Sequence, residues 1–299
     1  MTRHETQIAS CMMYGIMTHT KISSLLCLKL LQVNSDILKD RAKYTMIVSK
    51  ALLYVINLWP EKYGIVFKAS FIMMFITCAT MEISLVLYLL TSIENVNSLT
   101  KVISSIAVCL QSMTKMSIMF FRHKDLTFII KMVWYEFWPS NTMGTITENH
   151  IKTDSKRLLL LFFVVYGTGC MFLLLLIIGP AIIGVRKLPY SSWYPFDWST
   201  TPTYEILYTI QVYVAIYIIA NTVCGYDFLY CSICANCVAQ YRLLNEAIKY
   251  IGSGREEILT DFLFGLPGVN YRPVITKEYE DARKLLVICV NHHQKLIKY

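Results

Sequence analysis

Residues 158–184 are uncharged throughout: LLLLFFVVYGTGCMFLLLLIIGPAIIG, twenty-seven positions with neither a charge nor an amide side chain. As a helix this stretch would be roughly 40 Å long, which exceeds the ~30 Å hydrocarbon core of a bilayer. A soluble core helix needs no such run, so we expect it to cross a membrane. Gly167, Gly169 and the pair Gly179-Pro180 lie inside it. Such helix breakers are tolerated where neighbouring helices support the backbone, which indicates a bundle.

The composition agrees with a polytopic membrane protein. Charged residues make up 16% of the chain and hydrophobic residues 55%, whereas soluble domains carry about 25% charged residues. The formal net charge is +8, but the basic residues flank apolar segments and form no dense run. This pattern sets membrane orientation and argues against a nucleic-acid partner. Residues 1–20 are mixed polar, so we expect no signal peptide.

Four membrane helices are predicted, at 69–90, 102–121, 158–184 and 206–237. We expect a cytosolic N-terminal segment at 1–63, further cytosolic segments at 122–157 and 238–299, and an extracellular loop at 185–205. The long segments carry 23 of the 28 Lys and Arg, which places them in the cytosol by the positive-inside rule. The predicted fold class is therefore all-α, a single polytopic membrane domain with additional amphipathic cytosolic helices, one of them at 124–138.

Two ionisable residues lie inside predicted spans. Glu82 is the only acid of the first span and Lys115 the only charge of the second. A charge within the membrane is by default a functional hypothesis, but Glu82 can also pair with a neighbouring helix for packing, and both interpretations stay open. Lys115 is near the cytosolic end of its span, so we expect its ammonium group to snorkel to the membrane boundary.

No cofactor, metal site or catalytic constellation is expected. Cys231, Cys234 and Cys237 have the spacing of an iron–sulfur motif but lack the fourth ligand, so we interpret them as packing residues. Adjacent His292 and His293 project about 100° apart on a helix and cannot chelate one metal ion. Cys289 and His292 have no third residue to orient them, so they make a weak nucleophilic pair.

Four short motifs, each occurring once, follow one another along the chain. They are Leu58-Trp59-Pro60, Tyr194-Pro195-Phe196-Asp197-Trp198, Gln211 early in the fourth span, and the segment from Cys289 through His292-His293-Gln294 to Ile297. Their order and separation resemble the insect odorant receptor family over essentially the whole chain.

The resemblance implies a seven-helix receptor with a cytosolic N-terminus in the plasma membrane of olfactory sensory neurons. It implies binding of volatile ligands and gating of a cation channel in a heterotetramer with an obligate co-receptor. Four of the expected seven membrane helices are present, so we expect a fragment that passes no odorant-evoked current, either alone or with a co-receptor. Two alternatives are an insect gustatory receptor and, with less support, a membrane-bound acyltransferase that uses His292 or Cys289.

The resemblance also places an odorant site in the outer half of the helix bundle. At that depth, residues at the start of the fourth span recur at helical spacing and share one face. Tyrosine and glutamine offer hydrogen bonds, and methionine offers adaptable packing. The predicted ligand-binding residues are Tyr204, Tyr208, Gln211 and Ala215 on the fourth span, and Met171, Phe172 and Leu175 on the third. We expect the loop from Tyr190 to Trp198 to form either an aromatic lid or an interfacial anchor.

Overall fold

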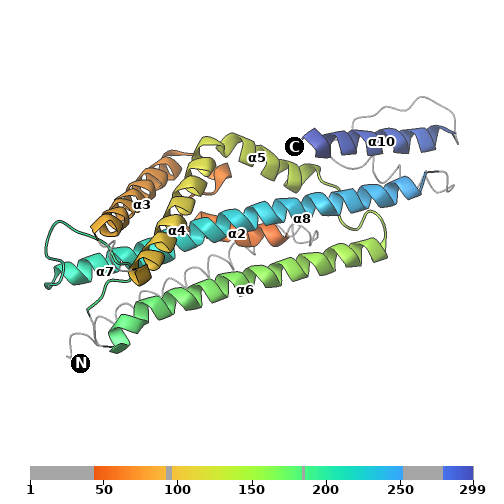
Figure 1. Cartoon of the computed structure of the whole chain (residues 1–299). Coiled ribbons are helices and arrows are strands. Elements are labelled where there is room, and N and C mark those ends of the chain that lie inside the picture. Colours follow the sequence, from red (N-terminus) through yellow and green to blue (C-terminus); the bar gives the residue numbers. More distant parts are fainter. Residues whose placement is uncertain (1–43, 92–95, 184–185, 252–278, 299) are drawn as a thin grey trace. The chain divides into compact units, whose positions relative to one another are not determined.

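The computed structural model describes residues 44–91, 96–183, 186–251 and 279–298. Within these ranges all regular structure is helical (Figure 1), which confirms the predicted all-α class. The elements are α2 (Thr45–Val55), the 3-10 turn η3 (Pro60–Lys62), α3 (Ile65–Thr91), α4 (Val96–Phe121), α5 (His123–Lys131), the π-helix η4 (Met132–Glu136), α6 (Thr145–Ile183), α7 (Thr203–Tyr213), the π-helix η5 (Val214–Ala220), α8 (Asn221–Lys249) and α10 (Tyr279–Lys298).

Four helical stretches are long and apolar enough to cross a membrane, judged by length and composition. They are Ile65–Thr91, Val102–Phe121, Thr145–Gly179 and Thr203–Lys249. Each of these stretches includes all or most of one predicted span. The third helix begins thirteen residues before the uncharged run, at Thr145. Its polar first turns are held by helix-compatible pairs such as Glu148 with Lys152, four residues apart.

The described chain divides into two compact units. The first unit comprises residues 48–123 and 162–227, and the second comprises residues 44–47, 124–161 and 228–298. Helices α6 and α8 contribute residues to both units. The candidate ligand site lies entirely in the first unit.

In the first unit, α3 and α4 pack against each other as neighbours (Figure 1). Aromatic rings join the start of α3 to the end of α4, where Phe71 stacks on Phe120 with ring centroids 4.1 Å apart. Just before α3, Tyr63 stacks on His123, the first residue of α5, at 3.6 Å. Such pairs stabilise a helix contact beyond the apolar area that they bury.

Helix α2 ends in a Schellman motif. The Leu58 N–H donates to the Leu53 carbonyl at 2.8 Å, and Asn57 adopts the left-handed conformation with φ 55°, which Asn tolerates better than most residues. Leu53 then packs directly on α8 at Gly225. A Cβ at position 225 would lie 2.8 Å from Leu53 Cδ2, so the close approach of α2 requires a glycine there.

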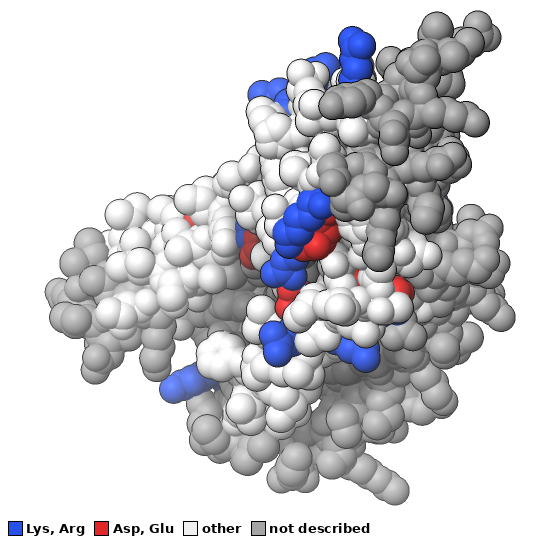
Figure 2. All heavy atoms as spheres, turned by 90° about the vertical axis from the view of Figure 1, so that its right-hand side faces the viewer, with Lys and Arg blue, Asp and Glu red and all other residues white. Residues whose placement is uncertain are grey.

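The second unit has its own apolar core. α8 and α10 contribute Ala239, Leu243, Leu244, Ala247, Leu285, Ile288 and Cys289, and the preceding segments contribute Trp138, Met143 and Ile151. Figure 2 shows Lys and Arg side chains beside Asp and Glu side chains on one face of the molecule. Within the second unit, Arg242 of α8 pairs with Asp154 of α6.

Candidate ligand-binding site

One face of α7 and η5 carries the residues that the sequence predicts for ligand binding. Tyr208, Gln211 and Ala215 are buried there and Tyr204 is half-buried. The rings of Tyr204 and Tyr208 lie 5.7 Å apart. Spacings of three and four residues along one helix place these side chains in a row, as the sequence predicts.

Gln211 is the hydrogen-bond centre of this face. Its Oε1 accepts a bond from the Tyr190 backbone N–H at 2.9 Å. Its Nε2 donates toward the Tyr190 carbonyl at 3.2 Å, the Ser192 hydroxyl at 3.1 Å and the Tyr194 hydroxyl at 3.2 Å. Gln211, which is 1% exposed, thus bonds three residues of the loop between α6 and α7 to the helix.

The same loop is held at two further places. The Trp193 N–H donates to the Ser84 carbonyl of α3 at 3.0 Å. Arg186 donates to the Ser199 carbonyl at 3.0 Å and lies 5.6 Å from the centre of the Tyr204 ring. These contacts close the loop over the beginning of α7.

Two ionisable groups of the loop have shifted pKa values. Burial raises the pKa of Tyr190, so its phenol stays protonated. The side chain and backbone N–H of Ser199 both donate to the Asp197 carboxylate and hold its pKa below the ordinary value. Asp197 therefore stays ionised at the loop tip, where it stabilises a turn.

The hydroxyls of the two α7 tyrosines bond to backbone carbonyls. Tyr204 Oη donates to the Lys187 carbonyl at 3.1 Å, and Tyr208 Oη donates to the Ile177 carbonyl of α6. Both hydroxyls therefore bridge α7 to the chain that precedes it. A ligand would meet mainly the rings of these residues unless it displaced one of these bonds.

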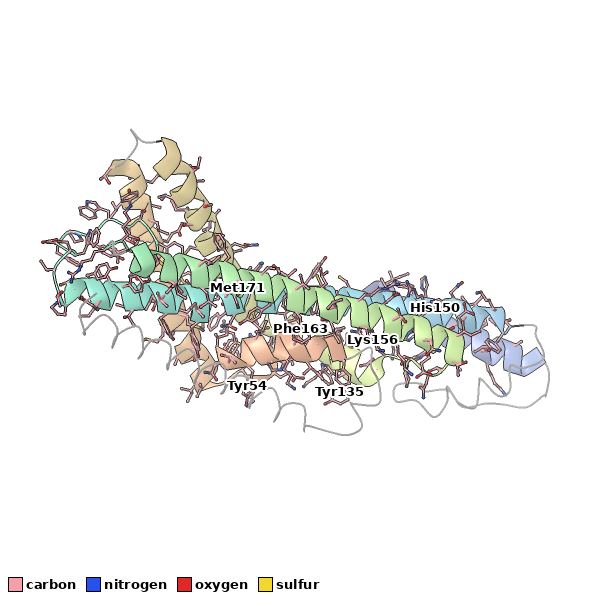
Figure 3. All side chains as sticks on the ribbon, turned by 90° about the horizontal axis from the view of Figure 1, so that it is seen from below. Tyr54, Tyr135, His150, Lys156, Phe163 and Met171 are labelled. Carbon is pink, nitrogen blue, oxygen red and sulfur yellow. The ribbon has the colours of Figure 1, made fainter. Side chains whose placement is uncertain are left out.

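The three predicted residues of α6 lie apart from the buried row. Met171, Phe172 and Leu175 are 60%, 67% and 68% exposed, so they are not packed under the loop with Tyr208 and Gln211. Figure 3 shows Met171 on the same long helix as Phe163, which is also exposed. The structure thus brings together the four predicted residues of the fourth span and leaves the α6 residues on an open apolar face.

Sequence reasoning missed an ion pair inside the first unit. The prediction that Lys115 snorkels to the membrane boundary is wrong, because its ammonium group lies 2.7 Å from Asp227 of α8 and the residue is 8% exposed. The sequence contains a signal for this ion pair. Lys115 and Asp227 are lone opposite charges in two predicted spans, and such charges favour pairing in the membrane.

Glu82 has a different environment. It contacts the Cys109 thiol of α4, and its Oε2 is buried with no hydrogen-bond partner among the described residues. Packing of α3 on α4 accounts for the thiol contact. The structure gives no account of the second carboxylate oxygen.

The residues of the acyltransferase alternative are buried in the second unit. His292 stacks on Trp138 at 4.1 Å, and its Nε2 lies 3.1 Å from Gln240 Oε1. Burial lowers the pKa of His292 to about 4 and raises the pKa of the Cys289 thiol to about 11. Near neutral pH the imidazole of His292 is therefore neutral and the thiol of Cys289 is protonated, and both side chains are buried.

No metal centre is found in the part of the chain that the structure describes, where no group of three or more His, Cys, Asp or Glu side chains is arranged to hold an ion. Cys231, Cys234 and Cys237 all lie on α8 as free thiols. Cys231 and Cys234 are exposed and Cys237 is half-buried, so within the described chain only Cys237 is partly packed, and the interpretation of all three as packing residues stays a prediction.

The fold and the site define the class of protein. Four membrane-length apolar helices, with a loop fixed over an aromatic and amide-bearing helix face, make a polytopic α-helical membrane protein with a candidate site for a small molecule. The family follows from comparison with known proteins. The family model described as 7tm Odorant receptor matches residues 95–299, and the chain belongs to this family.

Two solved structures have a similar fold. The insect olfactory receptor OR5 from Machilis hrabei matches with a TM-score of 0.59 and 15% identity, over 87% of this chain and 64% of that chain. The same receptor in complex with eugenol matches with a TM-score of 0.54 and 16% identity, over the same shares. This chain therefore spans about 64% of the length of that receptor. No curated protein matches the chain.

Proposed function

We propose that the protein recognises a volatile small molecule as an odorant receptor subunit and gates a cation channel together with an obligate co-receptor in a heterotetramer. Its proposed place is the plasma membrane of olfactory sensory neurons. Membership of the odorant receptor family supports the receptor role. The complex of the Machilis hrabei receptor with eugenol supports a small, mainly apolar ligand.

The observation that carries the proposal is the buried row Tyr208, Gln211 and Ala215 beneath the loop. Sites for small molecules are mostly apolar, with a few polar groups that fix orientation. Here the rings and the alanine supply apolar contact, and Gln211 supplies the polar group. Its two amide hydrogens face three acceptors, so one acceptor can be exchanged for a ligand oxygen without leaving the amide unpaired.

The last residue of the row lies in irregular helix. Ala215 belongs to the π-helix η5 (Val214–Ala220), and π-helical turns occur frequently at functional sites. The α6 residues Met171, Phe172 and Leu175 form an apolar face that is open to contact. We assign them to the apolar wall of the ligand site in the whole receptor.

Recordings from cells test the proposal. The whole receptor is expressed with the co-receptor, and currents evoked by a panel of volatile alcohols, aldehydes, esters and phenols are compared with those of the co-receptor alone. Tyr208→Phe and Gln211→Leu should each change the ranking of the odorants at unchanged surface expression. Thr209→Val, an exposed neighbour on α7, should leave the ranking unchanged.

Two outcomes would argue against the proposal. Odorant-evoked currents equal to those of the co-receptor alone would contradict the proposed receptor role. Variants of Tyr208 and Gln211 that lower surface expression but keep the odorant ranking would make these residues part of the scaffold only.

A further inference from the structure

Three lysines near the start of α3 are each held over an aromatic ring. Lys50 Nζ lies 5.6 Å from the centre of the Trp59 ring, Lys62 Nζ lies 4.1 Å from that of Tyr54, and Lys68 Nζ lies 5.1 Å from that of Tyr63. We refer to Lys50, Lys62 and Lys68 as the lysine collar. All three belong to the first unit, within nineteen residues of sequence.

The rings restrict the lysine side chains before any partner arrives. A lysine side chain loses considerable rotamer freedom when it binds, and a group that is already held loses less. Lys62 is held twice, because its ammonium group also donates to the Tyr54 hydroxyl. Tyr63 is itself fixed by stacking on His123, the first residue of α5. The segment that leads into α3 is thus anchored to the start of α5.

The local charge is positive. Glu61 is the only acid between positions 44 and 68, and its Oε2 accepts a bond from the Trp59 indole at 2.9 Å. On either side of His123 lie Arg122 and Lys124, followed by the acid Asp125, so this neighbouring segment also has a net positive charge. Lys62 and Lys68 are exposed, so their ammonium groups remain accessible beside the rings that hold them.

The collar is situated at a membrane boundary. The apolar helix α3 begins at Ile65, which is 87% exposed, and Val66 beside it is also exposed. Tyr54 is half-buried and Tyr63 is exposed, as expected of aromatic residues at headgroup depth, whereas Trp59 is buried and supports Lys50 from inside the protein. By the positive-inside rule this end faces the cytosol, where the leaflet contains anionic phospholipids.

From these observations we propose that the lysine collar binds the headgroup of an anionic phospholipid of the cytosolic leaflet. The ammonium groups of Lys62 and Lys68 contact the headgroup phosphate. The ammonium group of Lys50, which lies on α2, attracts the same phosphate electrostatically. Ile65 and Val66 contact the acyl chains of the same lipid. The proposal concerns a surface distinct from the loop over α7 and does not depend on odorant binding.

Lipid binding to the purified full chain tests this inference. The chain is placed in nanodiscs of phosphatidylcholine alone, of phosphatidylcholine with phosphatidylserine, or of phosphatidylcholine with phosphatidylinositol bisphosphate. Retained lipid is measured by native mass spectrometry. The anionic lipids should be enriched, and each Lys→Gln change in the collar should weaken that enrichment about fivefold. Soluble inositol phosphate should compete poorly, because it lacks acyl chains for Ile65 and Val66.

Two controls separate a built site from general attraction. The variant K152Q/K249Q/K295Q removes three lysines of the second unit, each paired with an acid on the protein, and should keep the enrichment. Tyr63→Leu keeps every charge but removes the ring under Lys68, and should weaken binding about threefold, whereas Tyr63→Phe should not.

The inference is overturned if the triple variant K50Q/K62Q/K68Q and the control K152Q/K249Q/K295Q lose anionic lipid equally, because binding then follows total charge. It is also overturned if Tyr63→Leu binds as the wild type does, or if the wild type shows no preference for anionic lipid. Circular dichroism and gel filtration of every variant exclude misfolding as the cause of a loss.

Discussion

Lys115 of α4 and Asp227 of α8 form an ion pair of 2.7 Å within two helices that are apolar enough to cross a membrane. The Lys115 ammonium group also lies 5.8 Å from the centre of the Tyr226 ring. Each residue is the only charged residue of its predicted span. Either charge alone would be unfavourable in hydrocarbon, so the pair fixes how α4 and α8 align.

The first prediction concerns this pair. Lys115→Met should lower the free energy of unfolding by roughly 2 kcal/mol. This is less than the 3–5 kcal/mol typical of a fully buried pair, because the Asp227 side chain is 49% exposed. The exchanged pair K115D/D227K should recover part of the loss. Thermal unfolding of the purified chain in detergent measures both effects. If the loss of stability in the exchanged variant equals the sum of the losses in K115D and D227K, the two residues do not interact.

The second prediction concerns the bond between Gln211 and the loop. Gln211→Leu removes all four hydrogen bonds of this side chain to residues 190–194, so the loop should open more often. Limited trypsin digestion should then cleave after Arg186 or Lys187 several times faster than in the wild type. Thr209→Val on the exposed side of α7 serves as the control. Equal cleavage rates in Gln211→Leu and the wild type would mean that other contacts hold the loop.

The third prediction concerns the close contact between α2 and α8. Gly225→Ala should be destabilising by about 1 kcal/mol, although alanine is the better helix former by about the same amount, because the new Cβ would overlap Leu53. Adding Leu53→Ala should remove the overlap, so the double variant should be more stable than the sum of the single effects. Thermal unfolding measures this coupling. A stabilised Gly225→Ala would show that α2 moves aside freely.

The fourth prediction is a pH dependence. His292 is 6% exposed and its pKa in the fold is about 4, against an ordinary value of about 6.5. Burial is the main cause, and the nearby positive charge of Lys295 and the neighbouring His293 add to it. Glu136, which pairs with Lys295 at 3.3 Å, partly offsets that charge.

The direction of this pH dependence follows from proton binding by the folded and unfolded chains. Between pH 6.5 and 4 the unfolded chain binds a proton at position 292 that the fold does not, so stability is complete above pH 6.5 and falls as the pH drops toward 4. The loss should reach roughly 3 kcal/mol. Thermal unfolding against pH measures it. His292→Gln should flatten this part of the curve and His293→Gln should not, whereas an unchanged curve in His292→Gln would assign the pH dependence to other groups.

The membrane helices could be predicted from the sequence because hydrocarbon excludes charged residues over a known length. The uncharged run 158–184 therefore identified α6. The same reasoning did not find that α6 begins at Thr145, because its first turns carry charges and hydropathy does not distinguish a charged helix from a charged loop. The π-helical turns at 132–136 and 214–220 also leave no mark in the hydropathy pattern.

The candidate site was predicted in part. Helical spacing placed Tyr204, Tyr208, Gln211 and Ala215 on one face. The partner of Gln211 was not predictable, because the loop at Tyr190 meets it by a tertiary contact across 21 residues that no local pattern describes. The position of Lys115 near the end of its span predicts a place at the membrane boundary. Its pairing with Asp227 is a contact between two helices, which the position of Lys115 along its own helix does not reveal.

Direct binding tests the central claim that this chain recognises a volatile ligand at the α7 face. The purified chain is placed in nanodiscs, and equilibrium binding of labelled volatile compounds is measured for the wild type and for Ala215→Phe, which fills the buried row. We expect saturable binding of at least one compound by the wild type and a loss of at least tenfold in Ala215→Phe. Ile206→Ala, on the exposed side of α7, should bind as the wild type does. Absence of saturable binding, or equal binding by Ala215→Phe, would contradict the account.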